Sequence, residues 1–81
     1  MRLDKYLKVS RLIKRRTIAN EACDSGRVLI NGKVAKASAE VKLEDIIEIQ
    51  FGNKSVKVKV TDILDTSKKD LAKDMYVYVT E

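Results

Sequence analysis

At 81 residues the chain can build one small core but not two, since domains of about forty residues usually need disulfides or metals to fold. Hydrophobic residues make up 44% and charged residues 36%, which excludes a disordered chain and a membrane span, and the formal net charge is +5. One cysteine and no histidine exclude an internal disulfide and the usual zinc and haem ligand sets. We therefore expect a single domain over residues 1–81, without a metal or another cofactor.

The chain opens with a short amphipathic segment. Leu3, Tyr6 and Leu7 repeat at helical spacing, which predicts a first helix with Tyr6 packed on the core and its hydroxyl reaching the surface. Asp4 precedes Lys8 by four residues, so we interpret Asp4 as half of a surface ion pair; the alternative is that it orients a neighbouring arginine or excludes a phosphate. The segment contains no apolar stretch of the kind a secretory signal needs, which favours a cytoplasmic location.

A break is expected after this helix. Val9, Leu12 and Ile13 repeat the helical spacing, but their stripe lies about 120° around the axis from the first one. One straight helix cannot bury both stripes. A turn near Ser10 would let the second group fold back onto the same core.

A second helix is predicted from about residue 15 to residue 25. Its apolar stripe consists of Ile18, Ala19, Ala22 and Cys23, and Gly26 stands where a helix C-cap belongs. Because Cys23 falls on this stripe, we interpret it as a small buried hydrophobe and not as a nucleophile.

Strand patterns fill the rest of the chain. Asn31 and Gly32 between two apolar runs predict a type I′ hairpin, and residues 45–51 and 56–60 have the composition and alternation of strands. The spacing in residues 67–70 can cap one helical turn, and residues 76–80 read as a last strand. Helices first and strands after indicate an α+β fold, with two to three short N-terminal helices packed on a small, mostly antiparallel sheet.

Positive charge is concentrated in residues 1–36, which carry ten basic and three acidic side chains, whereas the remaining 45 residues carry seven and nine. Such a distribution is typical of proteins that bind a polyanion; a surface charged only for solubility could use either sign. Phosphate contacts are therefore expected from Arg2, Lys5, Arg11, Lys14, Arg15, Arg16, Lys33 and Lys36, provided that the fold brings their segments together. Nothing resembles a catalytic motif, and we predict no enzymatic activity.

Three segments carry a family resemblance. Arg2-Leu3-Asp4-Lys5-Tyr6-Leu7, then Arg16-Thr17-Ile18-Ala19, then Gly26-Arg27-Val28-Leu29-Ile30-Asn31-Gly32-Lys33 resemble the RNA-binding domain family named after ribosomal protein S-four. Ile30 replaces a valine, and Arg15 replaces the usual Ser or Thr N-cap, which leaves the start of the second helix open. The resemblance divides the chain into an RNA-binding motif over about residues 1–50 and a C-terminal strand extension over about residues 51–81.

The resemblance implies an αL-type RNA-binding fold whose helices and hairpin form a basic platform. It adds Lys8 to the RNA-binding residues and includes Arg2, Lys5, Arg11, Arg15, Arg16 and Lys33. Stand-alone members similar in length bind a large ribosomal subunit that carries peptidyl-tRNA after translation has failed. By analogy, the chain would be a non-catalytic factor that contacts ribosomal RNA and tRNA and holds that tRNA while a partner protein extends the stalled chain with a tail.

Two other functions remain open at the level of sequence. The basic face could dock an acidic protein or a membrane surface, although we expect no membrane partner. Alternatively, the chain could be an accessory subunit that delivers RNA to a separate modifying enzyme.

Overall fold

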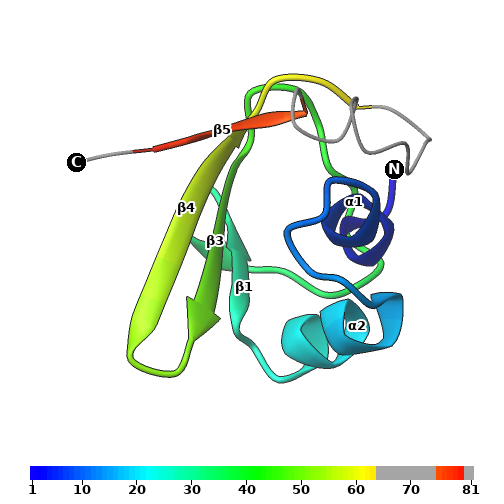
Figure 1. Ribbon diagram of the computed structural model, residues 1–81, viewed down its shortest axis with the longest axis vertical. Helices are drawn as coiled ribbons and strands as arrows, with labels where there is room; N and C mark the ends of the chain where they lie inside the picture. Colours follow the sequence, from blue (N-terminus) through cyan, green and yellow to red (C-terminus); the bar gives the residue numbers. More distant parts are fainter. Residues whose placement is uncertain (64–74, 80–81) are drawn as a thin grey trace.

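The computed structural model describes residues 1–63 and 75–79, which form two helices and a five-stranded sheet (Figure 1). In chain order the elements are α1 (Leu3–Val9), α2 (Arg16–Asp24), β1 (Val28–Ile30), β2 (Lys33–Val34), β3 (Ile46–Phe51), β4 (Lys54–Val60) and β5 (Tyr76–Tyr78). Both helices lie on one side of the sheet (Figure 1). The predicted α+β fold is thereby confirmed, while the helical turn predicted at residues 67–70 lies outside the described residues.

The predicted break between the helices is also confirmed. Helix α1 ends at Val9, and Ser10 caps it with a backbone N–H that donates to the last turn. Arg11 then takes a φ of 64°, the left-handed conformation that reverses the chain direction. As a result Val9 and Ile13, each 6% exposed, enter the same core as Leu3.

Helix α2 buries a narrower stripe than predicted. Ala19 and Cys23 are buried, but Ile18, which was expected beside them, is 50% exposed. The small side chains of Ala19 and Cys23 contact the core. Ile18 is rotated about 100° from Ala19 around the helix axis, which places it at the edge of the buried stripe. The C-cap prediction holds, because Gly26 has a φ of 79° and its N–H donates to the carbonyl of Cys23 at 3.1 Å.

The strands pair in the order β2-β1-β3-β4-β5, and each pair is antiparallel. Asn31 and Gly32 join β1 to β2 with φ values of 53° and 82°, as a type I′ turn requires. On the helix-facing side Ile47 pairs with Val58, and both are fully buried. On the other side Glu48 pairs with Lys57, and their side chains approach to 3.9 Å. The period-two pattern of β3 and β4 therefore separates the core from the solvated face.

Helix α1 is fastened to the C-terminal part of the chain by Tyr6. The Tyr6 side chain is completely buried, and its hydroxyl donates to the carbonyl oxygen of Met75 at 2.8 Å. The same oxygen accepts the N–H groups of Thr61 and Asp62 at 2.9 and 3.2 Å. The prediction that this hydroxyl reaches the surface is wrong, because residue 75 lies over that end of the ring. Burial raises the pKa of Tyr6 well above its usual value.

Candidate nucleic-acid interface

The carboxylate of Asp4 is the centre of a polar network between the two helices. Its side chain is only 3% exposed. It accepts four hydrogen bonds: Oδ1 from the backbone N–H of Lys5 (2.8 Å) and Nε of Arg2 (3.3 Å), and Oδ2 from Nδ2 of Asn20 (3.3 Å) and Nε of Arg16 (3.4 Å). Lys8 is not among these partners within the described residues, so the predicted ion pair between Asp4 and Lys8 is wrong. The other interpretation of Asp4, that it orients neighbouring arginines, agrees with the geometry.

The local fold explains why these groups meet. The first turn of α1 leaves backbone N–H groups without helical partners, and Leu3 and Asp4 donate theirs to the carbonyls of Ala39 and Ala37 at 2.8 and 3.2 Å. This fixes the N-terminal end of α1 against the segment that follows β2. Arg16 and Asn20 are one turn apart on α2 and therefore project from the same side of that helix. Asp4 lies where these two elements meet.

The network keeps Asp4 ionised. Burial by itself would raise the pKa of this carboxyl group. The hydrogen bonds from Asn20, Arg16 and the Lys5 amide, together with the positive charge of Arg16, outweigh burial and hold the pKa of Asp4 below its ordinary value of 3.8. Asp4 is therefore an anion near neutral pH and can hold two guanidinium groups.

Among the described residues, each of the two arginines contacts Asp4 through its Nε edge. The Arg2 and Arg16 side chains are 54% and 49% exposed, and each uses its Nε–H for Asp4. The Nη groups of each fork lie beyond this anchor, and planar guanidinium forks of this kind bind phosphate oxygens in pairs. A hollow of about 370 Å³, lined by Asp4, Arg16, Thr17, Asn20 and Glu21, opens beside Arg16. The arrangement can therefore present two fixed cations to one RNA backbone.

The other predicted RNA-binding residues surround this network to different extents. Lys36 directly precedes Ala37, whose carbonyl holds α1, so its backbone lies beside the N-terminal end of that helix. Lys33 lies on β2, and no contact joins it to Asp4 in the part of the chain that the structure describes. The remaining members lie along α1, Lys5 and Lys8, and in the connection to α2, Arg11, Lys14 and Arg15. Among the nine, Lys5 and Lys8 are half-buried and the others are exposed.

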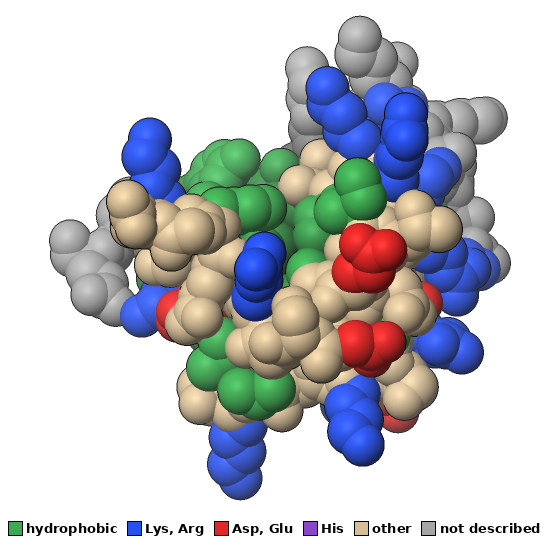
Figure 2. Space-filling model, turned by 90° about the horizontal axis from the view of Figure 1, so that it is seen from below, with side chains coloured by type: hydrophobic (Ala, Val, Ile, Leu, Met, Phe, Trp, Pro, Cys, Tyr) green, Lys and Arg blue, Asp and Glu red, His purple; other side chains and the backbone are tan. Residues whose placement is uncertain are grey.

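Seen from below, the molecule has several Lys and Arg side chains gathered at one corner, at the upper right of Figure 2, and others around its margin. Between them lie hydrophobic and acidic side chains, other polar surface and a further basic side chain near the centre (Figure 2). On the face shown in Figure 2 the basic side chains are therefore not continuous. Within residues 1–63 and 75–79, Arg2 and Arg16 are brought together by their shared acceptor, the Asp4 carboxylate.

Asn20 is a member of this network that is not among the predicted RNA-binding residues. The signal was present, because Asn20 follows Arg16 by four residues and so shares its side of the helix. What spacing could not reveal is the acceptor, a carboxylate on another helix.

Helix α2 starts without a side-chain cap. Its N-cap residue is Arg15, which makes no side-chain hydrogen bond to the first turn of the helix.

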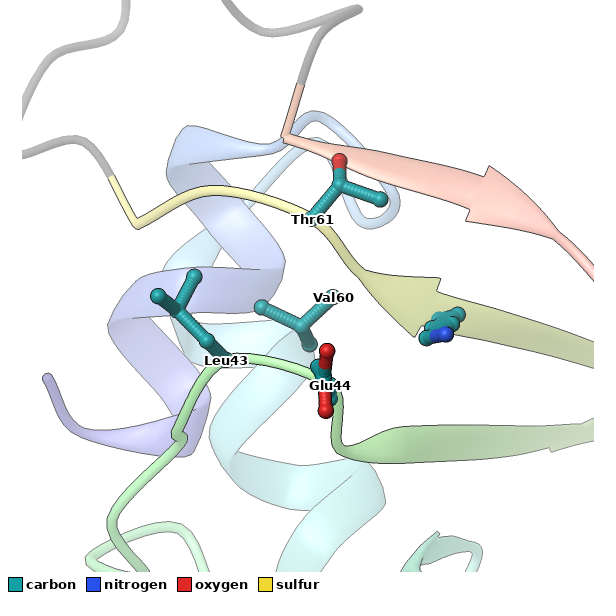
Figure 3. Close-up of a pocket in the computed structure, with 5 residues that line it drawn as sticks. Leu43, Glu44, Val60 and Thr61 are labelled. Atoms are coloured by element: carbon teal, nitrogen blue, oxygen red, sulfur yellow. The ribbon is translucent and has the colours of Figure 1, made fainter.

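Other candidate sites offer less chemistry. A hollow of about 420 Å³ at the end of β4 is lined by Leu43, Glu44, Lys59, Val60 and Thr61 (Figure 3). It contains one carboxylate and one ammonium group, and the described residues include no group of three side chains able to hold a metal. Burial raises the pKa of Cys23 to about 11, so its thiol stays protonated at neutral pH. Neither α1 nor α2 is long and apolar enough to span a bilayer.

The sequence matches a known domain family and is similar to several named bacterial proteins. The S4 domain matches residues 1–47. Over all 81 residues the chain is 54% identical to the RQC P-site tRNA stabilizing factor of Streptococcus pneumoniae and 56% identical to that of Bacillus subtilis, and it covers 92% and 94% of those proteins. It is 34% identical over 65 residues to the heat shock protein 15 homolog of Haemophilus influenzae, of which it covers 50%.

Solved structures agree with this similarity. The trimeric structure of heat shock protein 15 from Vibrio cholerae superposes with a TM-score of 0.90 at 29% identity, over 98% of this chain and 81% of that one. The solution structure of a protein described as hypothetical superposes with a TM-score of 0.85 at 32% identity, over 100% and 99% of the two chains. The described elements therefore form the same fold as these proteins.

Proposed function

Because this chain belongs to the S4 domain family, we propose that it is an RNA-binding factor of ribosome-associated quality control that stabilises tRNA in the P site of the large ribosomal subunit. The observation that carries the proposal is the anchoring of Arg2 and Arg16 on one buried carboxylate. The names of two relatives that are 54% and 56% identical over all 81 residues of this chain support the ribosomal role.

The physical basis is preorganisation. A guanidinium group that is already held in place loses less conformational freedom when it binds a phosphate than a free arginine does. Folded RNA is recognised mainly through phosphates, 2′-hydroxyl groups and shape, so a small rigid basic surface is sufficient. The protein would therefore act by binding, without catalysis, and its action on ribosomal subunits would take place in the cytoplasm.

Two RNA surfaces require two contact regions. We assign one to Arg2, Arg15 and Arg16, and the other to Lys33 and Lys36 beyond the hairpin. Lys5, Lys8, Arg11 and Lys14 would add phosphate contacts between them. In this proposal one region meets ribosomal RNA and the other meets tRNA, while a separate tailing factor extends the nascent chain.

The test is co-sedimentation of the purified protein with bacterial large ribosomal subunits that carry P-site tRNA. Arg16→Ala is expected to weaken binding by about tenfold or more and to reduce the slope of log affinity against log salt by about one. The matched control is Lys54→Ala, which also removes one positive charge, at the first residue of β4. Undiminished binding of Arg16→Ala, or retention after the RNA has been digested by nuclease, would contradict the proposal.

The finer assignment needs a different measurement. A cryo-EM map of native particles isolated through the tagged protein would show which RNA each region meets and which protein accompanies it. A map with the Arg2 and Arg16 side chains against protein or solvent, and not against an RNA backbone, would exclude the assignment of the two regions.

A further inference from the structure

Asn20 is a half-buried residue of α2 to which the proposed function gives no role. Its Nδ2 donates to Oδ2 of Asp4 at 3.3 Å, and the same oxygen accepts from Nε of Arg16 at 3.4 Å. The amide group thus touches the carboxylate that anchors the arginine. Because Asn20 is uncharged, it contributes nothing to the net attraction for a polyanion.

The four donors to Asp4 differ in how firmly they are held. Arg2 and Arg16 have long side chains with several rotatable bonds, and about half of each is exposed. The Lys5 donor is a backbone N–H within α1, and the Asn20 donor is a short side chain on α2. The two firm donors address different oxygens, Oδ1 and Oδ2 respectively.

This division fixes the plane of the carboxylate. The last torsion of an aspartate side chain is broad, so one hydrogen bond leaves the second oxygen free to swing. With Lys5 holding Oδ1 and Asn20 holding Oδ2, each oxygen has a set position. Arg2 then finds its acceptor on one side and Arg16 finds its acceptor on the other, and the two guanidinium groups are held apart in a defined geometry.

We propose that Asn20 is a positioning residue for RNA binding, which fixes the Asp4 carboxylate so that Arg16 and Arg2 present their outer edges to phosphates in one orientation. The inference rests on the proposed function, because it assumes that these arginines contact RNA. It adds that affinity depends on an uncharged side chain that lies behind them.

Asn20→Ala separates this role from charge and from folding. Alanine has a higher helix propensity than asparagine, so α2 is retained, and the net charge does not change. Affinity for purified bacterial large ribosomal subunits carrying P-site tRNA is expected to fall about five- to tenfold, with an unchanged salt slope. Asn53→Ala makes the same substitution in the β3–β4 turn and is expected to bind like the wild type.

A double-variant cycle supplies the second readout. If Asn20 acts through the anchored arginine, Asn20→Ala adds less than a twofold loss in the Arg16→Ala background. Carbonyl-detected NMR titration supplies a third, because the pKa of Asp4 should rise in Asn20→Ala when this hydrogen bond is lost.

The outcomes distinguish the positioning role of Asn20 from the proposed RNA-binding function. Wild-type affinity of Asn20→Ala together with weak binding of Arg16→Ala would overturn the positioning role and leave the proposed function intact. Losses that multiply in the double variant would also overturn it, since Asn20 would then act independently of Arg16. Undiminished binding of both single variants would remove the proposed function and this inference with it.

Discussion

Asp4 and Tyr6 lie two residues apart on α1, and each makes a polar contact with a distant part of the chain, yet the two contacts differ in kind. Asp4 holds charged groups whose outer halves are in solvent, whereas Tyr6 makes a neutral hydrogen bond inside the core. The difference teaches that one helix can serve binding with one side chain and stability with another. Substitutions at the two positions should therefore affect different measurements.

The largest effect on stability is expected at Tyr6. Tyr6→Ala removes a completely buried aromatic ring and should lower the free energy of unfolding by about 3–5 kcal/mol, as truncations of large core side chains usually do. Urea denaturation followed by circular dichroism measures this. Tyr6→Phe keeps the ring and should lose only about 0.5–1.5 kcal/mol, the value of one hydrogen bond, because Thr61 and Asp62 still donate to the Met75 carbonyl. A larger loss of unfolding free energy for Tyr6→Phe than for Tyr6→Ala would contradict the view that Tyr6 stabilises the fold mainly through its buried ring.

A smaller but more informative effect is expected at Asp4. Asp4→Asn should cost about 1.5–3 kcal/mol of stability at pH 7, because hydrogen bonds to a charged acceptor are lost. It should also weaken RNA binding, although the protein becomes more positive, because Arg2 and Arg16 lose their anchor. Filter binding at fixed salt shows whether the RNA affinity of Asp4→Asn falls or rises. Tighter binding would mean that Asp4 only offsets positive charge.

The stability difference between Asp4→Asn and the wild type should depend on pH. The pKa of Asp4 is lowered in the folded protein, so its contribution is complete above the unfolded value of 3.8 and is lost as the pH falls through the folded value. Thermal unfolding at pH 7 and at decreasing pH should therefore show the two proteins converging in acid. A difference that stays constant would show that the ionised carboxylate does not stabilise the fold.

The smallest effect is expected on the solvated face of the sheet. Glu48 lies 3.9 Å from Lys57 there, and surface ion pairs contribute little. Glu48→Gln should change the free energy of unfolding by less than about 0.5 kcal/mol and leave RNA affinity unaltered. It is a reference for both measurements, and a loss of binding here would show that the sheet face also contacts RNA.

Features that depend on local spacing could be predicted from the sequence. The α2 C-cap at Gly26, the turn at Asn31 and Gly32 and the alternation in β4 each follow from the chemistry of a few adjacent residues. The break after α1 could be predicted because two apolar stripes cannot share one core. The arginines at positions 2 and 16 could be identified as candidates from charge and resemblance alone.

Contacts between distant elements could not be predicted in the same way. The acceptors of Asn20 and Tyr6 are a carboxylate on another helix and a backbone carbonyl 69 residues away, and neither leaves a periodic signal. The four-residue spacing of Asp4 and Lys8 predicts a pair because it favours one on an isolated helix, whereas α2 offers Asp4 two donors in the folded protein. The RNA-binding roles of all nine basic residues, Arg2 and Arg16 included, stay predictions.

The Met75 carbonyl also has a consequence for the order of events during protein synthesis. Tyr6 leaves the exit tunnel long before Met75 is made, and until then its hydroxyl lacks the partner that seals α1 against the sheet. Residues 1–47, which carry the S4 match, cannot supply that acceptor. A chain that ends before residue 75 therefore lacks the carbonyl oxygen that accepts from Tyr6 in the folded protein, and this part of the core can be completed only after Met75 has been added.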